Sequence, residues 1–312
     1  MLARLIPHAW TRCCMGSCDQ PPRIAVLGSL DSWHCQKLAA AFSRHGIELS
    51  YADPLSLKAA LGSQVEVSSN YGILSNLDLL LVREVPGGSL EQVIFRMDAL
   101  HQLENSGVAV INSPYAIEKM VDKYYTLSLL QQAGISVPDT RVCEDFSTAM
   151  QFFEELGGDV VVKPLFGSRG IGMVRVTESD TAGRVFKALQ MGNYVYYLQR
   201  FIPHGNRDTR VMVVGTDCIA AMDRVSDSWK TNIHNGSTPH AREMDLEMQA
   251  ICLQAASMLG AAYCGIDLVQ DEDSTLYVLE VNSMPAWQGL QQVTTVDIAQ
   301  SIVNHCLSHI SR

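Results

Sequence analysis

The sequence lacks any apolar run of the roughly 18 residues that a membrane span needs. It also lacks an excess of positive charge, because 23 Lys and Arg residues face 33 Asp and Glu residues and the net charge is −10. Nucleic-acid phosphates are bound by clustered Lys and Arg, so only a local positive pocket remains compatible with this balance. We therefore expect neither a membrane nor a nucleic acid as a partner.

Recognised cysteine patterns are also missing, although the chain has nine cysteines. Those at Cys143, Cys218, Cys252 and Cys264 are scattered singly through apolar segments, which indicates reduced thiols in a cytoplasmic protein. Residues 1–22 lack the uninterrupted apolar stretch of a signal peptide and are predicted to form a disordered tail. Zinc-site spacing is absent from the two terminal clusters, which are Cys13, Cys14 and Cys18, and His305, Cys306 and His309.

What the first third does contain is an alternation of apolar runs with amphipathic segments. Helices are predicted at 33–46 and 93–107, and Gly46 and Gly107 close them. Strands that alternate with helices predict a parallel sheet covered by helices. Gly28 lacks the two further glycines of a dinucleotide-binding fingerprint, so we interpret it as a tight turn. The predicted strands are 23–30, 47–53, 77–84 and 108–112.

The pattern changes after Asn112. Ser113 and Pro114 are typical of a helix start, and Asp122 is typical of the cap of the next helix. The remaining half is predicted to be mostly antiparallel sheet with helices. Its predicted elements are two strands joined by a glycine-rich loop (158–176), a strand (194–202), a hairpin turning at 215–217, and a helix from Asp245 to Leu259 stopped by Gly260.

Two apolar segments near the end, 264–270 and 275–281, are joined by four good turn residues. A four-residue loop puts Asp267 opposite Val278, so that Asp267, Glu280 and Asn282 share one face of the hairpin. Two carboxylates and an amide oxygen form the hard oxygen site that Mg²⁺ prefers. The alternative is an edge hairpin whose polar groups face water, but both strands are otherwise too apolar for that.

Lys163 ends an apolar strand and precedes a loop with three glycines. The order of these residues matches neither the P-loop nor the dinucleotide fingerprint. Backbone N–H groups of such a loop can still close over phosphates. A plain glycine-rich hairpin is the alternative, and the acid–acid–Asn set downstream favours phosphate binding.

Together these residues resemble the ATP-grasp carboxylate–amine ligases, and within them the RimK-like glutamate ligases. The resemblance is close from about Asn112 to the C-terminus and looser before it. It implies a combined α/β and α+β architecture, in which two α+β subdomains clamp ATP beside an N-terminal parallel-sheet (pre-ATP-grasp) domain. The implied divisions are 1–22 (tail), 23–112 (N-terminal domain), 113–200 (central subdomain with the glycine loop) and 201–312 (C-terminal subdomain with the metal site).

The resemblance also implies a role for individual residues. Arg224, Lys163 and Arg210 correspond to catalytic positions, and Arg224 is expected to face the transferring phosphoryl group. The implied metal ligands are Asp267, Glu280 and Asn282. The implied nucleotide contacts are Lys123, Lys163, Gly167, Ser168, Gly170, Gln199, Arg200, Phe201, Ile202, Asp208, Lys230 and Asn232.

Two positions depart from the family pattern. Arg200 stands where the adenine hinge usually has Glu, which alters nucleotide preference only if the side chain makes the contact. Lys230 stands where Arg is usual, so the charge is kept and the planar fork is lost. Loops 235–236 and 283–289 are expected to border the acceptor site. Tryptophans 229 and 287 are expected to pack or to wall the acceptor site rather than stack on the nucleotide.

The implied reaction is amide formation through an acyl phosphate, with ATP and two Mg²⁺ ions, or Mn²⁺ in their place. The expected partners are ATP, L-glutamate and a carboxylate acceptor, and the resemblance is compatible with a homo-oligomer. The stretch 82–100 looks closest to tetrahydromethanopterin glutamate ligases. The alternatives are a ligase for a protein C-terminus, another cofactor or an amino-group-carrier protein, and a non-catalytic ATP-binding module.

Overall fold

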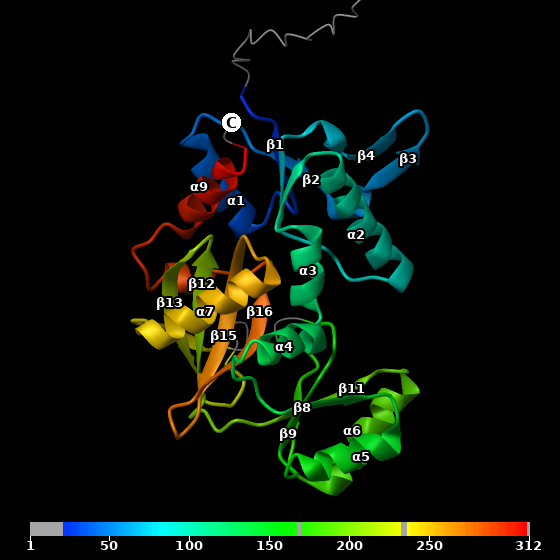
Figure 1. Ribbon diagram of the computed structural model, residues 1–312, viewed down its shortest axis with the longest axis vertical. Coiled ribbons are helices and arrows are strands. Elements are labelled where there is room, and N and C mark those ends of the chain that lie inside the picture. Colours follow the sequence, from blue (N-terminus) through cyan, green and yellow to red (C-terminus); the bar gives the residue numbers. More distant parts are fainter. Residues whose placement is uncertain (1–20, 168–169, 232–235, 311–312) are drawn as a thin grey trace, which may run out of the picture.

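The computed structural model describes residues 21–167, 170–231 and 236–310 (Figure 1). The predictions for the tail cysteines, Ser168, Asn232 and Asn235 lie outside these residues. Within them, no helix is both long enough and apolar enough to cross a membrane. The six cysteines described are free thiols; of the four predicted as reduced thiols in apolar segments, Cys252 and Cys264 are buried, whereas Cys143 and Cys218 are half-buried.

The first unit is built on a fully parallel sheet with the strand order β2-β1-β6-β7, as predicted. All residues of β1 and β6 are buried, because helices cover the sheet and its strands are apolar throughout. The strands are β1 (Ile24–Leu27), β2 (Ser50–Ala52), β6 (Leu79–Val82) and β7 (Ala109–Ile111), and the helices are α1 (Trp33–Ser43) and α2 (Leu90–Asn105).

A small antiparallel sheet, β3-β4-β5, was not predicted and extends from this unit (Figure 1). Every residue of β3 is exposed, so little apolar burial marks these strands in the sequence. Its strands are β3 (Lys58–Leu61), β4 (Val65–Ser69) and β5 (Gly72–Ile73), flanked by single 3₁₀ turns at Pro54–Ser56 and Leu74–Asn76.

Two short helices, α3 (Pro114–Val121) and α4 (Lys123–Gln132), lead away from the first unit. The α4 helix begins as predicted, because the side chain of Asp122 accepts a hydrogen bond from the Tyr125 amide. Just before α3, the buried Asn112 side chain donates to the carbonyls of Tyr263 (2.8 Å) and Ser283 (2.7 Å). Its oxygen accepts from the amides of Ala262 and Tyr263, so one side chain ties the first unit to the last strands of the chain.

The second unit is an antiparallel sheet, β10-β9-β11-β8, covered by two helices on one face. The glycine-rich segment joins β9 to β10, and these strands pair antiparallel, as predicted. The strands are β8 (Thr140–Cys143), β9 (Val160–Lys163), β10 (Val174–Val176) and β11 (Tyr196–Arg200), and the helices are α5 (Phe146–Glu155) and α6 (Ser179–Met191).

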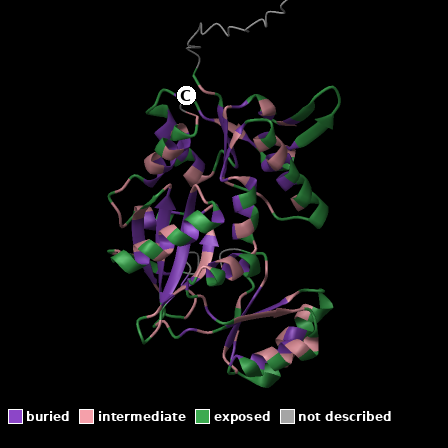
Figure 2. Cartoon of the chain, viewed as in Figure 1, coloured by how far each residue is buried: buried purple, intermediate pink, exposed green. Residues whose placement is uncertain are grey.

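The third unit is a five-stranded antiparallel sheet, β14-β13-β12-β15-β16, which is mostly buried (Figure 2). Helix α7 (Leu246–Leu259) starts at the Asp245 cap and ends at Gly260 in the left-handed conformation, as predicted. The strands are β12 (Arg207–Val214), β13 (Asp217–Val225), β14 (Thr238–Ala241), β15 (Tyr263–Gln270) and β16 (Leu276–Asn282), followed by α8 (Gln288–Gln291) and α9 (Ile298–Ser308).

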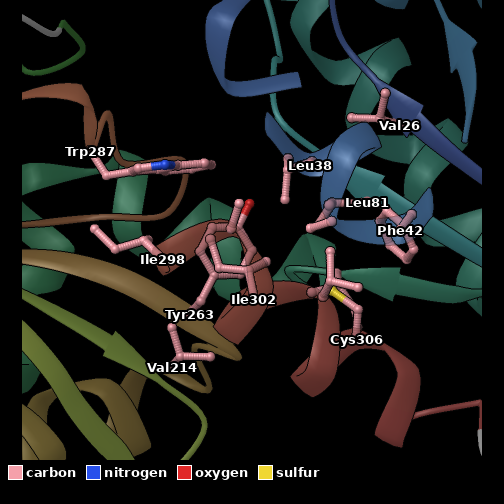
Figure 3. Packing of buried hydrophobic residues seen from close by; sticks show 14 of the residues in the cluster. Val26, Leu38, Phe42, Leu81, Val214, Tyr263, Trp287, Ile298, Ile302 and Cys306 are labelled. Carbon is pink, nitrogen blue, oxygen red and sulfur yellow. The ribbon is translucent and has the colours of Figure 1, made fainter. Parts of the chain in front are cut away.

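The last helix, α9, packs on α1 of the first unit and also contacts β12 of the third unit (Figure 1). Residues of α9 such as Ile302 and Cys306 share a buried cluster with Leu38, Leu81 and Tyr263 (Figure 3). The C-terminal segment therefore fills the space between the parallel sheet and one face of the five-stranded sheet.

Candidate active site

Successive side chains of β12 and β15 point to opposite faces of the five-stranded sheet, and the two faces carry different kinds of side chain. Residues such as Val211 and Ile266 face the cluster that contains α7. Their neighbours face the opposite way, so that Met212 joins the α9 cluster while Arg210 and Asp267 lie further along the same face. That face is therefore apolar at one end of the strands and charged at the other.

The charged end holds a network of two arginines and two aspartates. Arg210 makes two hydrogen bonds to Asp267, each of 2.7 Å. Arg224 donates to both oxygens of Asp208, with 2.7 Å for the Nε bond, and also lies 3.1 Å from Asp267. Burial opposes ionisation of Asp267, but the two arginines outweigh it and lower its pKa to about 2. Asp267 is therefore held as an anion by neighbouring guanidinium groups.

The predicted register of the β15–β16 hairpin is wrong by two residues. Asp267 lies opposite Glu280, not Val278, because the loop has five residues and a bulge follows Asp267. Each irregularity shifts the pairing by one residue, so Val278 pairs with Leu268 in the α7 cluster. The total shift of two beyond the bulge leaves Asp267 and Glu280 on one face. Glu280 and Asp267 thus remain on one face, as directly opposed rather than diagonal neighbours.

Two lysines approach the same region from the second unit and from α4. Lys163 is buried at the end of β9, and its Nζ donates to the Gln199 oxygen at 2.5 Å. Lys123 is the first residue of α4, and its Nζ donates to the Gly167 carbonyl at 2.8 Å. Burial, and the nearby charge of Lys123, lower the pKa of Lys163 to about 8, although Glu280 acts in the opposite direction. Neither lysine has a carboxylate within 4 Å among the residues described.

These groups line one cleft between the second and third units. The cleft brings together nine of the predicted nucleotide contacts, of which Lys163 is also a predicted catalytic residue, with a second predicted catalytic residue and two predicted metal ligands. Gly167 is exposed and lies beside Lys123 rather than on the cleft wall. The members of the set are Lys123, Lys163, Gly170, Gln199, Arg200, Phe201, Ile202, Asp208, Lys230, Arg224, Asp267 and Glu280.

The RimK-like ATP-grasp domain model matches residues 120–306 of this chain. A tetrahydromethanopterin:alpha-L-glutamate ligase of Methanococcus maripaludis is 33% identical over 92% of this chain and 98% of its own length. The chain belongs to the RimK-like ATP-grasp family. It is accordingly an ATP-dependent ligase, as its sequence predicts.

Solved structures agree on the ATP-grasp fold. A RimK-domain ATP-grasp protein from Sphaerobacter thermophilus has a TM-score of 0.73 at 23% identity, covering 91% of this chain and 98% of its own. The ATP-grasp ligase PsnB, in a complex with a precursor variant, Mg and ADP, has a TM-score of 0.72 at 22% identity, covering 93% and 99%. The predicted fold class is therefore confirmed.

Arg200, the unusual residue at the predicted adenine hinge, forms an ion pair. Its guanidinium lies 3.2 Å from Asp139, and both side chains are about half exposed. The next residue, Phe201, packs its ring under Arg175 at 3.5 Å, and Arg175 is held by Asp159. Both the side chain and the backbone N–H of Arg200 are therefore engaged by Asp139, because the N–H donates to the Asp139 carbonyl at 2.8 Å.

The oxygen ligands of the predicted metal site are unequally available. Glu280 accepts no hydrogen bond and forms no ion pair with the residues described, and burial together with Asp267 raises its pKa. The Asn282 amide donates through Nδ2 to the Gly265 carbonyl at 3.3 Å, which leaves its oxygen for a ligand. Asp267 is already occupied by Arg210 and Arg224.

A divalent cation fits this chemistry only with ligands from outside the chain. In the part of the chain described, no three His, Cys, Asp or Glu side chains form a metal-binding group. Glu280 and Asn282 can contribute oxygens, and phosphates and water would complete the shell, as Mg²⁺ prefers. Asp267 can join them only by releasing an arginine. The terminal pair His305 and His309 makes a ring contact at 4.7 Å and lies outside this site.

A second and larger cavity lies on the other side of the charged network, with a volume of about 610 Å³. It is bounded by the predicted loop from Met284 to Gly289, by Arg210 and Asn282, and by the first unit. Arg224 and Glu280 line both cavities. The two cavities therefore share a wall made of one cation and one anion.

Sequence reasoning missed several residues that line these cavities. Trp229 lines the same cleft as Lys163, edge-on to Phe201 at 6.3 Å, although we expected it to pack or to wall the acceptor site. Trp287 is buried in the core, as its packing alternative predicted. His34, Arg83 and Glu84 line the larger cavity and had no predicted role. A signal was available for Arg83 and Glu84, because ligands bind outside the carboxyl ends of parallel strands and both residues directly follow β6.

Proposed function

We propose that this ligase joins L-glutamate to a carboxylate acceptor, and that the acceptor is tetrahydromethanopterin or a related pterin. The observation that carries this proposal is the match to a tetrahydromethanopterin:alpha-L-glutamate ligase over nearly the full length of both chains. Two further relatives with the same printed name, at 30% and 31% identity, support it.

The two adjoining cavities support a division between the reactants. We propose that ATP occupies the cleft with Lys163, that the acceptor enters the larger cavity, and that the γ-phosphate lies at the wall shared by Arg224 and Glu280. An acceptor carboxylate oxygen attacks the γ-phosphorus, and ADP leaves with the electrons of the broken P–O bond. The glutamate amine then attacks the acyl carbon, phosphate leaves, and the amine proton is released.

Cations are required because the carboxylate and the triphosphate are both anionic. Four cations, Lys123, Lys163, Arg210 and Arg224, lie around the three carboxylates Asp208, Asp267 and Glu280, and Arg200 and Lys230 also line the cleft. In the proposed reaction Lys123 and Lys163 hold the phosphates, and Arg224 stabilises charge on the transferring oxygens, with Arg210 beside it. Both oxygens of Asp208 are bonded to Arg224, so we propose that Asp208 orients Arg224 rather than binds ribose.

One or two bound Mg²⁺ ions, or Mn²⁺ ions in their place, would neutralise more of the negative charge on the phosphates. Glu280 and Asn282 are the proposed ligands from the chain, with Asp267 as a third if an arginine moves to phosphate. The loop that contains Gly167 and Gly170 is proposed to shield the acyl phosphate from water. Adenine is proposed to contact the backbone of Arg200 and Ile202, and Lys230 to reach the phosphates.

The test is an ATP-dependent phosphate-release assay with L-glutamate and a panel of acceptors, followed by mass measurement of the product. Tetrahydromethanopterin, a deazaflavin cofactor and a carrier protein form the panel. We expect phosphate release only with glutamate and the pterin, and a product heavier by whole glutamate residues. Product with another acceptor would assign the alternative ligase activity, and release without glutamate would refute the proposed amine.

A further inference from the structure

The larger cavity lies at a place where parallel sheets commonly bind ligands. Strand β1 pairs in parallel with β2 on one side and with β6 on the other. The following strands are therefore added to opposite sides of β1, and the switch point of the strand order lies between β1 and β6. Ligands favour the crevice beyond the carboxyl ends of two such strands. Gly28 follows β1 and Arg83 follows β6, and both line the cavity.

Close packing fixes the side chain of Arg83 at this crevice. A Cβ atom at Gly28 would lie 3.3 Å from the Arg83 Cβ, so the glycine makes room for the arginine. The guanidinium donates to the Pro285 carbonyl at 2.8 Å and to the Tyr263 hydroxyl at 3.2 Å. It also lies 4.6 Å from the centre of the Trp287 ring. Tyr263 and Trp287 are themselves held in the core between the first and third units (Figure 3).

The charge of Arg83 is not balanced by the protein. No Asp or Glu lies within 4 Å of it among residues 21–167, 170–231 and 236–310, whereas the neighbouring Arg210 and Arg224 are both paired with aspartates. A guanidinium has five N–H donors, and the described contacts use two of them. A positioned cation with free donors is the group that recognises a carboxylate.

We propose that Arg83 binds a non-reacting carboxylate of a substrate in the larger cavity. This inference rests on the proposed function, because glutamate joined through its amine brings carboxylates that are not consumed. The incoming glutamate keeps its α- and γ-carboxylates, and the acceptor can carry a second acidic group. The reacting groups would meet at the wall formed by Arg224 and Glu280, while Arg83 holds the substrate from the side of the first unit.

A purely structural role for Arg83 makes a different prediction. The bonds to Pro285 and Tyr263 connect the first unit to the third, so an arginine that only stabilises this contact would affect folding and every ligand alike. A carboxylate-binding arginine would instead affect one substrate and leave the nucleotide unchanged. The readout that separates the two roles is therefore selectivity between ligands, not loss of activity.

The experiment is calorimetric titration of the full chain loaded with Mg²⁺ and a non-hydrolysable ATP analogue. The variants are Arg83→Met, which keeps an apolar stem against Trp287, and Arg83→Gln, which keeps a donor for the Pro285 carbonyl. Arg184→Met removes an exposed helix arginine, paired only with Asp180, and is the matched control. The probes are L-glutamate, L-glutamine, the α-amide of glutamate, and tetrahydromethanopterin.

We expect Arg83→Met to weaken one probe roughly 10- to 100-fold, the effect of losing a charge-assisted hydrogen-bonded pair. If glutamate is the source of the carboxylate, the wild-type protein prefers glutamate to one of its two amides, and the variant loses that preference. If the acceptor is the source, only tetrahydromethanopterin binding weakens. The ATP analogue should bind within twofold of wild type in every variant.

Unchanged affinity for both glutamate and tetrahydromethanopterin in a folded Arg83 variant would overturn the proposal. So would a wild-type protein that binds neither. If Arg83→Met does not fold, the same comparison is made with Arg83→Gln, and equal weakening of all ligands there would assign the structural role instead. These titrations measure binding and do not require turnover. If the protein binds glutamate through Arg83 but forms no glutamate product, the proposed function is refuted and the proposed role of Arg83 is not.

Discussion

Replacement of Lys163 by Met should stabilise the free protein while weakening its binding of ATP. The Lys163 ammonium is buried at the end of β9, where its described hydrogen-bond partner is the Gln199 amide and no carboxylate lies within 4 Å. Met has a similar length and no charge, so it can occupy the same space without the cost of burying an ammonium.

The magnitude follows from the pKa of Lys163. A tenfold change in proton affinity corresponds to about 1.4 kcal/mol, so a fall from 10.5 to about 8 corresponds to about 3 kcal/mol. Below pH 8 Lys163 is charged in both states, and this penalty on the folded protein is present in full. Loss of the bond to Gln199 returns about 1–2 kcal/mol, which leaves a net stabilisation of about 1–2 kcal/mol at pH 7.

The pH dependence has a definite sign. Between pH 8 and 10.5 the folded state has released the Lys163 proton and the unfolded state still holds it, so wild-type stability gains from this residue as the pH rises. The Met variant lacks that contribution, so the difference between the two proteins should shrink above pH 8 and reverse before pH 10.5, once the remaining penalty is smaller than the contribution of the Gln199 bond. ATP affinity at pH 7 should fall roughly 10- to 100-fold, because a charged contact to phosphate is lost.

Urea denaturation of both proteins at several pH values between 7 and 10.5 measures the first effect, and calorimetric titration with ATP and Mg²⁺ measures the second. Lys58→Met, on the exposed strand β3, is the control and should change neither. The reasoning would be refuted by a Met variant that is less stable than wild type at pH 7, or by a stability difference that does not depend on pH. An unchanged ATP affinity would show that Lys163 is structural.

Three other substitutions test separate parts of the site and the fold. Glu280→Ala should lower the rate of phosphate release at least about 10²-fold without unfolding the protein, and normal activity would disprove its proposed metal contact. Asn112→Ala should lower the free energy of unfolding by about 3–5 kcal/mol in urea titrations, since four hydrogen bonds are lost, and a cost below about 1 kcal/mol would contradict the linking role. Arg200→Gln should leave ATP affinity within about threefold in calorimetry, because the side chain pairs with Asp139, and a larger loss would mean that the guanidinium contacts nucleotide.

Much of the fold was predictable because its signals are local. Buried strands such as β1 and β6 are apolar throughout, and the α7 helix has both a cap at Asp245 and a stop at Gly260. The charged face of the β15–β16 hairpin was also predictable, because the side-chain alternation of a strand does not depend on its partner. The individual nucleotide contacts were predicted only from the family resemblance. Lys123, for example, looks like an ordinary helix residue when its sequence neighbourhood is considered alone.

Features that depend on distant contacts were not predictable. The bulge after Asp267 leaves no composition signal, so the pairing with Glu280 could not be read from the strands. Helix α9 is amphipathic, but nothing in its sequence indicates that its apolar side meets α1, almost the length of the chain away. Arg83 gains its significance only when the third unit brings Pro285 and Tyr263 to it.

The wall of Arg224 and Glu280 has an evolutionary consequence. Segments before residue 90 and the loop after β16 surround the larger cavity, whereas residues from Lys123 to Thr231 contribute most of the cleft proposed to hold ATP. Mutations that reshape one compartment can therefore accumulate while the phosphate chemistry in the other is preserved. A lineage with this architecture could exchange one acceptor for another by altering a few loops, which agrees with relatives that are named as a tetrahydromethanopterin:alpha-L-glutamate ligase and as an alpha-aminoadipate–LysW ligase.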